Sequence, residues 1–208
     1  RDWSSDVCSS DLPAALEDPH LHVSRLKILI DGTQMDFKFD CVEGIAFTYF
    51  KDVKGTLNMN DAKVLVQHAL KLGENSKYLE TGSYLGCSAT IVACHSNATV
   101  YAHDIWVSDW SELKGAPPPE VTDYFYEFYG NVKRNNLETR IIPIRGDSSY
   151  TLGIHDKKSI DLAFIDGDHS YEGCIKDLEK VKPLMKENSV ILVHDCYPGS
   201  ETLRAVQD

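Results

Sequence analysis

From Lys77 onward the sequence alternates short apolar runs with segments of helical spacing, and this alternation limits the fold more than any other feature. The apolar runs cover residues 77–82, 99–106, 140–147, 160–168 and 189–195, and helical candidates lie near 88–95, 120–135 and 171–186. Strands joined through helices form parallel βαβ units, and strands covered on both faces read as continuous apolar runs. The sequence therefore predicts an α/β protein with a doubly wound, mostly parallel, Rossmann-like sheet.

The segment before this alternation predicts smaller elements. Leu26–Ile30 and Met35–Phe39 alternate apolar and polar residues on either side of Asp31-Gly32, which predicts a β-hairpin. Helical spacing then begins at Asn60, a candidate N-cap, and ends before Gly73. We expect residues 13–57 to form an N-terminal hairpin extension and residues 58–208 to form the main domain.

Residues 1–12 (RDWSSDVCSSDL) have neither a helical period nor the basic and then apolar order of a signal peptide. Read back into codons, residues 2–12 match a translated sequencing-library adapter. We therefore expect residues 1–12 to be disordered, and the reading frame to come from a metagenomic assembly in which the true start is lost.

Composition excludes several classes of function. The 208 residues are 42% hydrophobic, which suits one globular core, and the formal net charge of -11 disfavours a nucleic-acid partner. No apolar run approaches the roughly 18 residues that span a bilayer, so we expect no membrane partner. Beyond residue 12 the cysteines are odd in number and lack C-x-x-C spacing, which favours a reducing, cytoplasmic compartment over a zinc site or a disulfide framework.

Each of the five expected parallel strands ends at or near an acidic residue. These residues are Glu80, Asp104, Asp147, Asp166 and Asp195. One acid at a strand end is often a cap or turn residue, but ligands of open parallel sheets bind outside the carboxyl ends of the strands. Five acids at five ends therefore predict a ligand pocket at this edge of the sheet.

The turn after the first of these strands carries two glycines, Gly82 and Gly86, in a G-x-x-x-G spacing. Tyr84 stands where a dinucleotide-binding turn has another glycine, which disfavours NAD and FAD. Asp104, at the end of the next strand, stands where an acid binds the hydroxyls of a ribose. A plain strand-to-helix turn is the alternative, but turn and acid together predict a nucleoside pocket.

Five ordered motifs resemble those of class I S-adenosylmethionine-dependent methyltransferases. They read E-T-G-S-Y-L-G-C-S, H-D-I-W, R-G-D-S, F-I-D-G-D-H-S-Y-E-G and V-H-D, and the fourth resembles the methyltransferase domain 24 group in particular. The resemblance covers about residues 58–200 and implies the class I sheet, with S-adenosylmethionine as cofactor. A pocket rimmed with carboxylates suits the sulfonium and ammonium charges of this molecule.

The resemblance also implies a set of cofactor-binding residues. The methionine end would lie at Glu80, Gly82, Ser83, Gly86 and Ser88. Asp104 would bind the ribose hydroxyls, and Asp147 and Ser148 the adenine. Trp106 would flank the adenine ring, with core packing as the alternative, and Asp166 would lie beside the transferred methyl group.

The acceptor is expected next to Asp166 and Asp195, because neighbouring strands bring these carboxylates together with His169 and His194. The predicted reaction is methyl transfer to a small-molecule hydroxyl, on a sugar or a phenol. His169 is the predicted base, with Asp166 beside it, whereas His194 is equally well a structural histidine. The alternatives are an inactive cofactor-binding module of a larger protein, with an upstream domain lost, and a hydroxylase-like relative.

The sequence leaves open whether the site binds a divalent metal such as Mg²⁺. Asp166 and Asp195 match the metal ligands of catechol-type and macrolide-sugar O-methyltransferases. Cys196 and His194, however, stand where those families have Asn and an acid, and both are poor ligands for Mg²⁺. Asp168 is either a ligand or, as we prefer, the cap of the helix that begins near Tyr171.

Relatives of this class continue to a sixth and a seventh strand, and the seventh lies antiparallel between the fifth and the sixth. Here only the start of a helix follows, over residues 201–207. We therefore expect a sheet truncated after its fifth strand, in which the strand ending at Asp195 is a bare edge. Such a fragment would be prone to aggregation.

Overall fold

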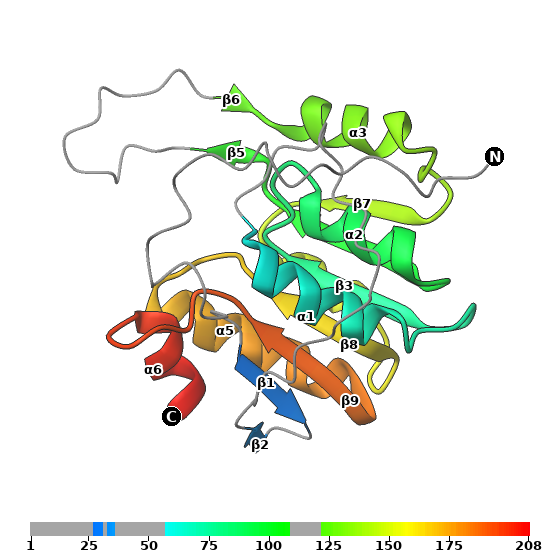
Figure 1. Cartoon of the computed structure of the whole chain (residues 1–208). Helices are drawn as coiled ribbons and strands as arrows, with labels where there is room; N and C mark the ends of the chain where they lie inside the picture. Colours follow the sequence, from blue (N-terminus) through cyan, green and yellow to red (C-terminus); the bar gives the residue numbers. More distant parts are fainter. Residues whose placement is uncertain (1–26, 31–32, 36–56, 109–121) are drawn as a thin grey trace, which may run out of the picture.

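A computed structural model describes residues 27–30, 33–35, 57–108 and 122–208. Its main sheet has seven strands in the order β2-β1-β9-β8-β3-β4-β7 (Figure 1). The strands are β1 (Lys27–Ile30), β2 (Thr33–Met35), β3 (Lys77–Thr81), β4 (Thr99–Asp104), β7 (Ile141–Arg145), β8 (Ile160–Ile165) and β9 (Met185–Val193). The five from β9 to β7 pair in parallel, which confirms the predicted doubly wound α/β fold. A separate antiparallel pair joins β5 (Val107–Ser108) and β6 (Thr122–Asp123).

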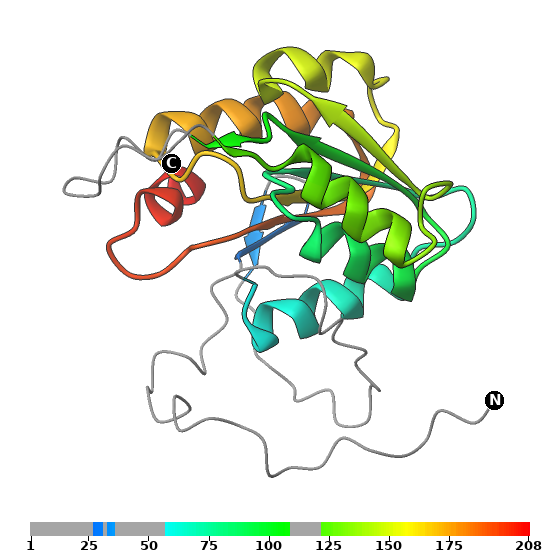
Figure 2. The same ribbon diagram turned by 90° about the horizontal axis from the view of Figure 1, so that it is seen from above.

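Helices cover both faces of the main sheet (Figure 2). They are α1 (Met59–Ala69), α2 (Cys87–His95), α3 (Phe125–Arg134), α4 (Ser148–Thr151), α5 (Tyr171–Val181) and α6 (Glu201–Gln207), with 3₁₀ turns η4 (Leu152–Ile154) and η5 (Lys182–Leu184). Because successive strand residues point to opposite faces, Tyr78 of β3 joins the core under α1, α2 and α3, whereas Leu79 joins the core under α5 and α6. Two hydrophobic cores therefore hold the central strands from both sides.

The register of the sheet aligns the C-terminal ends of β3, β8 and β9. Thr81 pairs with Ile165, and Ile165 pairs with Val193. The pairing continues one residue further, because the backbone N–H of Asp166 donates to the carbonyl of Thr81 at 3.0 Å and that of His194 donates to Ile165 at 2.9 Å. The polar residues that follow β3, β8 and β9 thus meet at one edge of the sheet.

Two predicted helix caps are wrong by two residues each. Asn58, and not Asn60, caps α1, since its side-chain oxygen accepts hydrogen bonds from the N–H groups of Asn60 and Asp61, both at 3.0 Å. Ser170, and not Asp168, caps α5 through a hydrogen bond from Gly173 at 3.1 Å. In both cases a nearby residue of equal capping propensity has the extended backbone that a cap requires.

The edge of β9 is covered, contrary to the sequence-based expectation. β1 pairs antiparallel with β9 from Lys27↔Val193 to Ile30↔Val190, and β2 pairs antiparallel with β1. The predicted hairpin therefore adds two strands to the sheet, and β1 takes the place that the resemblance gives to a seventh strand. Its second strand begins at Thr33, before the predicted run, and residues 36–39 of that run lie outside the described part, as do residues 1–12.

None of the described helices is long and apolar enough to cross a bilayer.

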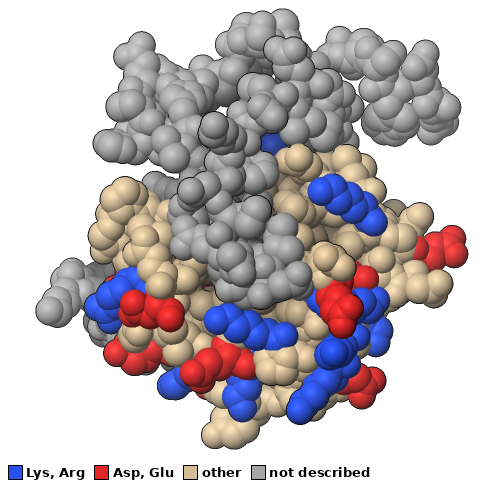
Figure 3. Space-filling view, turned by 90° about the horizontal axis from the view of Figure 1, so that it is seen from below, with Lys and Arg blue, Asp and Glu red and all other residues tan. Residues whose placement is uncertain are grey.

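Figure 3 shows basic and acidic side chains interspersed over one face of the molecule. Ion pairs join such charges, as between Lys186 and Asp161 at 2.8 Å and between Lys158 and Glu187 at 3.9 Å.

Candidate functional site

A cavity of about 750 Å³ opens at the carboxyl ends of the parallel strands. Each central strand contributes residues at or just beyond its end, including Thr81, Asp104, Gly146, Asp166 and His194. The predicted pocket is therefore present where an open α/β sheet binds its ligands.

The glycines of the turn after β3 are required by packing. Gly82 has a φ of +83°, and a Cβ there would lie 2.0 Å from the carbonyl oxygen of Asp166. Gly86 has a φ of +85°, and its Cβ would lie 2.9 Å from the ring of Phe128. Only glycine accommodates both the left-handed backbone and these close approaches. Gly82 lines the cavity, whereas Gly86 begins α2 behind it.

Glu80 is buried behind this turn with Ser83 and Ser88, and none of the three is among the described residues that line the cavity. The Tyr78 hydroxyl donates to its carboxylate at 2.8 Å. Burial raises the pKa of Glu80 to about 7, against hydrogen bonds from Tyr78, Ser83 and Ser88 that lower it. Glu80 thus lies beneath the turn and not at the surface of the cavity.

Asp104 lines the cavity at the end of β4, as predicted for the residue that binds a ribose. Its carboxylate accepts the backbone N–H groups of Tyr84 at 2.7 Å and Trp106 at 2.5 Å. Burial raises its pKa, and these two hydrogen bonds lower it. Asp104 therefore also fixes the glycine-containing turn against the end of β4.

Of the two alternatives for Trp106, the structure places it in the core. Its side chain is 1% exposed, its ring packs on Phe125 and Phe128, and its indole N–H donates to the carbonyl of Tyr84 at 2.8 Å. Ile105 lines the cavity instead and is 53% exposed. The positive φ of Trp106, +50°, interrupts the strand alternation, and this is why the sequence pattern missed Ile105.

Asp147 and Ser148 line the cavity after β7. Asp147 caps α4 by accepting the N–H of Ser149 at 2.8 Å, and the hydrogen bonds from Ser149 lower its pKa. Ser148 donates its hydroxyl to Asp177 of α5 at 2.6 Å. Asp177 was not predicted, although helical spacing from Cys174 and Val181 places it on the buried face of α5.

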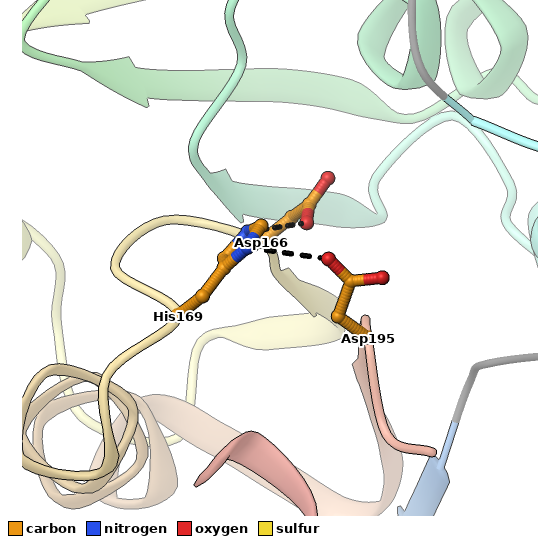
Figure 4. Close-up of side chains that lie close together, drawn as sticks. All are labelled: Asp166, His169 and Asp195. Carbon is orange, nitrogen blue, oxygen red and sulfur yellow. Dashed lines mark ion pairs between the residues drawn. The ribbon is translucent and has the colours of Figure 1, made fainter. Parts of the chain in front are cut away.

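At the other side of the cavity, His169 lies between two carboxylates (Figure 4). Its Nε2 is 3.4 Å from Asp166 and its Nδ1 is 3.2 Å from Asp195. Hydrogen bonding to Asp166 raises the pKa of His169, and burial lowers it. The predicted cluster is therefore assembled, and the imidazole is 54% exposed to an incoming molecule.

His194 extends this cluster inward. Its Nδ1 is 2.8 Å from Asp166 and its Nε2 is 3.2 Å from Asp61, a fully buried carboxylate on α1. Burial lowers the pKa of His194, but hydrogen bonds to Asp166 and Asp61 outweigh it and raise the pKa to about 10. The carboxylates around His194 thus favour its protonated form, and Asp61 is a partner that the sequence did not reveal.

The carboxylates of Asp166 and Asp195 and the imidazole of His169 each offer one metal-ligand atom, and these atoms lie within 4.8 Å of one another. Mg²⁺ prefers oxygen ligands, so the two carboxylates suit this ion better than the imidazole does. The imidazolium of His194 also lies beside Asp166 and repels a second cation. Cys196 is buried, with its thiol 3.6 Å from the carbonyl of His194.

Comparisons with known proteins agree with this geometry. Residues 79–196 match a family model described as a methyltransferase domain. No curated protein matches the chain.

Several solved structures share the fold. A SAM-dependent O-methyltransferase from Thermotoga maritima has a TM-score of 0.53 at 16% identity, over 74% of this chain and 51% of its own. A precorrin 8w decarboxylase from Methanobacterium thermoautotrophicum has a TM-score of 0.51 at 21% identity, over 68% of this chain and 64% of its own. Cofactor-bound Rv0187 from MTB has a TM-score of 0.53 at 20% identity, over 66% and 56%. The chain thus spans less than two thirds of each of these proteins.

Proposed function

The chain belongs to the methyltransferase-domain family, and from this membership we propose that it transfers the methyl group of S-adenosylmethionine to a hydroxyl of a small molecule, such as a sugar or a phenol. The observation that carries the proposal is a single cavity with two chemically different sides. Asp104 beside the glycine-containing turn suits a ribose, and the cluster of His169, Asp166 and Asp195 suits a hydroxyl that must lose its proton.

In the proposed binding mode, S-adenosylmethionine lies along the ends of β3, β4 and β7. Its ribose hydroxyls donate to Asp104, and its adenine lies against Ile105, near Asp147 and Ser148. Its methionine end lies over the turn at Gly82, where the ammonium and sulfonium groups would favour the ionised form of buried Glu80. The methyl group then faces Asp166.

The proposed reaction is an in-line displacement. The acceptor oxygen bonds to the methyl carbon while the carbon–sulfur bond breaks, and the sulfonium becomes a neutral thioether. The hydroxyl proton passes to His169, and the resulting imidazolium is stabilised by Asp195, 3.2 Å from Nδ1. His194 is not suited to take this proton, because its side chain is only 7% exposed and its carboxylate partners raise its pKa to about 10.

The proposed reaction is written without Mg²⁺, because His169, one of the three possible ligand groups, serves as the base. Turnover should therefore survive EDTA, and added Mg²⁺ should not raise it. Loss of activity in EDTA, restored by a divalent ion, would contradict this and would make Asp166 and Asp195 ligands.

Two measurements test the proposal. Calorimetry with S-adenosylhomocysteine should detect binding, and radiolabel from S-adenosylmethionine should pass to one member of a panel of sugars and phenols. Binding without transfer to any acceptor would favour the alternative of an inactive cofactor-binding module. Absence of binding would overturn the cofactor assignment itself.

Asp104→Ala should weaken S-adenosylhomocysteine binding about 10- to 100-fold, because a charge-assisted hydrogen bond contributes roughly 1.5–3 kcal/mol. Glu179→Gln, an exposed change on α5, is the matched control and should bind normally. Equal affinities for wild type and Asp104→Ala would exclude Asp104 as the ribose acceptor.

A further inference from the structure

We propose that Asp177 is a positioning residue that fixes the adenine-binding segment of the site by joining the start of α4 to the end of β3. The inference rests on the proposed function, in which the adenine lies near Asp147 and Ser148. It assigns a role to a residue of α5 that neither the sequence motifs nor the reaction requires.

Asp177 uses both oxygens of its carboxylate on hydroxyl groups. Oδ1 accepts from Ser148 at 2.6 Å, and Oδ2 accepts from Thr81 at 2.7 Å. Ser148 is the first residue of α4, and Thr81 is the last residue of β3, directly before Gly82. One side chain thus connects the two segments expected to hold opposite ends of the cofactor.

Asp177 lies on the apolar face of α5. Its side chain is 4% exposed, and the other buried side chains of α5 are Cys174, Leu178 and Val181. Burial raises the pKa of Asp177, while the hydrogen bonds from Ser148 and Thr81 lower it. An apolar residue could pack here without the cost of burying a charged group. The carboxylate is therefore explained by its hydrogen bonds to Ser148 and Thr81 and not by core packing.

A third segment also packs against Asp177. A Cβ on Gly167 would lie 3.2 Å from Oδ2 of Asp177, so the loop between Asp166 and His169 passes directly over the carboxylate. Thr81, Gly167, Ser148 and Asp177 all line the cavity. Asp177 is therefore in contact with the ends of β3 and β8 and with the segment after β7.

The segment after β7 depends on such a tether. α4 is only four residues long, and a single helical turn has little stability of its own. Asp147 at its N-cap is exposed, so its direction follows that of the turn that begins at Ser148. Without the Ser148–Asp177 hydrogen bond, Asp147 would lose the fixed direction that recognition of an adenine amino group requires.

The test compares two ligands, S-adenosylhomocysteine and its deaminated analogue S-inosylhomocysteine, which lacks the adenine amino group. Wild type should prefer the adenosyl ligand about 10-fold, since the analogue leaves a polar group of the site unpaired. In Asp177→Ala the ratio of the affinities for the adenosyl and inosyl ligands should fall towards one. Asp177→Asn should retain most of it, because an amide can accept from one hydroxyl and donate to the other. Glu179→Gln is the control on the same helix and should keep the full ratio.

Thr81→Val, which keeps the branched side chain and removes the hydroxyl, covers the case in which Asp177→Ala does not fold. It should lower the ratio about threefold by removing the anchor on β3. If Asp177 had a purely structural role, its loss would weaken the binding of both ligands equally and leave the ratio of the two affinities unchanged. Discrimination by wild type with unaltered ratios in Asp177→Ala or Thr81→Val would overturn the inference, and so would a wild type that does not discriminate. Failure of wild type to bind either ligand would instead overturn the proposed cofactor.

Discussion

At the scale of single residues, the two histidines of the cluster differ in exposure. The side chain of His169 is 54% exposed, whereas that of His194 is 7% exposed and held between Asp61 and Asp166. A base must reach its substrate, so the difference supports the proposal that His169 takes the proton and that His194 orients Asp166.

His169→Ala should therefore leave the affinity for S-adenosylhomocysteine nearly unchanged and lower kcat by about 10² to 10⁴. Single-turnover transfer of radiolabel measures the rate, and calorimetry measures the affinity. His95→Ala, at the end of α2, is the control and should have normal kcat. Normal turnover in His169→Ala would show that the base lies elsewhere or that proximity alone carries the reaction.

A second histidine pair predicts how stability depends on pH. Nδ1 of His103 lies 2.9 Å from the hydroxyl of Thr151, and its Nε2 lies 2.9 Å from Nε2 of His155. Burial, followed by the charge of His155, lowers the pKa of His103 from 6.5 to about 3. The unfolded chain therefore binds this proton more readily than the folded one.

The contribution of His103 to stability is fully present above pH 6.5 and is lost as pH falls towards 3, by about 1.4 kcal/mol per pH unit. Urea unfolding at pH 7.5 and pH 5.0 should show wild type losing about 2 kcal/mol more than His103→Gln, which cannot titrate. His95→Gln should behave like wild type. An identical pH dependence in wild type and His103→Gln would mean that folding does not change the pKa of His103.

At the scale of elements, the first turn of α1 shows how a cap is chosen. Asn58 and Asn60 are both good capping residues, but only Asn58 has the extended backbone, with φ of -74° and ψ of 162°, that directs its side chain to the free N–H groups. The local sequence contains both candidates, and the entry of the chain into the core at Leu57 selects between them.

Asn58→Ala should lower the free energy of unfolding by about 1 kcal/mol, because two N–H groups of the first turn lose their acceptor. Asn60→Ala is the matched control and should cost less. Chemical denaturation of both variants provides the comparison. A larger loss in Asn60→Ala would show that α1 begins later than the structure describes.

At the scale of the whole molecule, the hairpin completes the sheet. β1 pairs with β9 over four residue pairs, from Val190 to Val193, so the edge is covered in the C-terminal half of β9. The expectation of aggregation depended on a bare β9, and β1 removes that reason. Strand edges left open are sites of association between chains.

A variant lacking residues 1–36 should therefore form soluble oligomers or aggregate, whereas a variant lacking only residues 1–12 should behave like the full chain. Light scattering after size-exclusion chromatography measures the association state, and a thermal melt measures cooperativity. A monomeric, cooperatively melting variant without residues 1–36 would show that β9 needs no cover.

Much of the site could be predicted because it follows from local order along the chain. Strand-length apolar runs and helical segments alternate, parallel strands end at the same edge, and the acids at those ends must then meet, as Asp104, Asp166 and Asp195 do. These features depend on neighbouring residues and on a general property of parallel sheets, so no knowledge of the particular packing was needed.

The sequence by itself thus determined the class of fold, the position of the pocket and the acids and His169 that line it. Only the tertiary structure decided that β1 covers β9, that Asp61 holds His194 across 133 residues, and that Asp177 reaches Thr81 across 96. It also decided that Ile105, and not Trp106, faces the cavity. Contacts between distant segments depend on which surfaces meet when the helices pack on the sheet, and a single sequence carries no local period that records them.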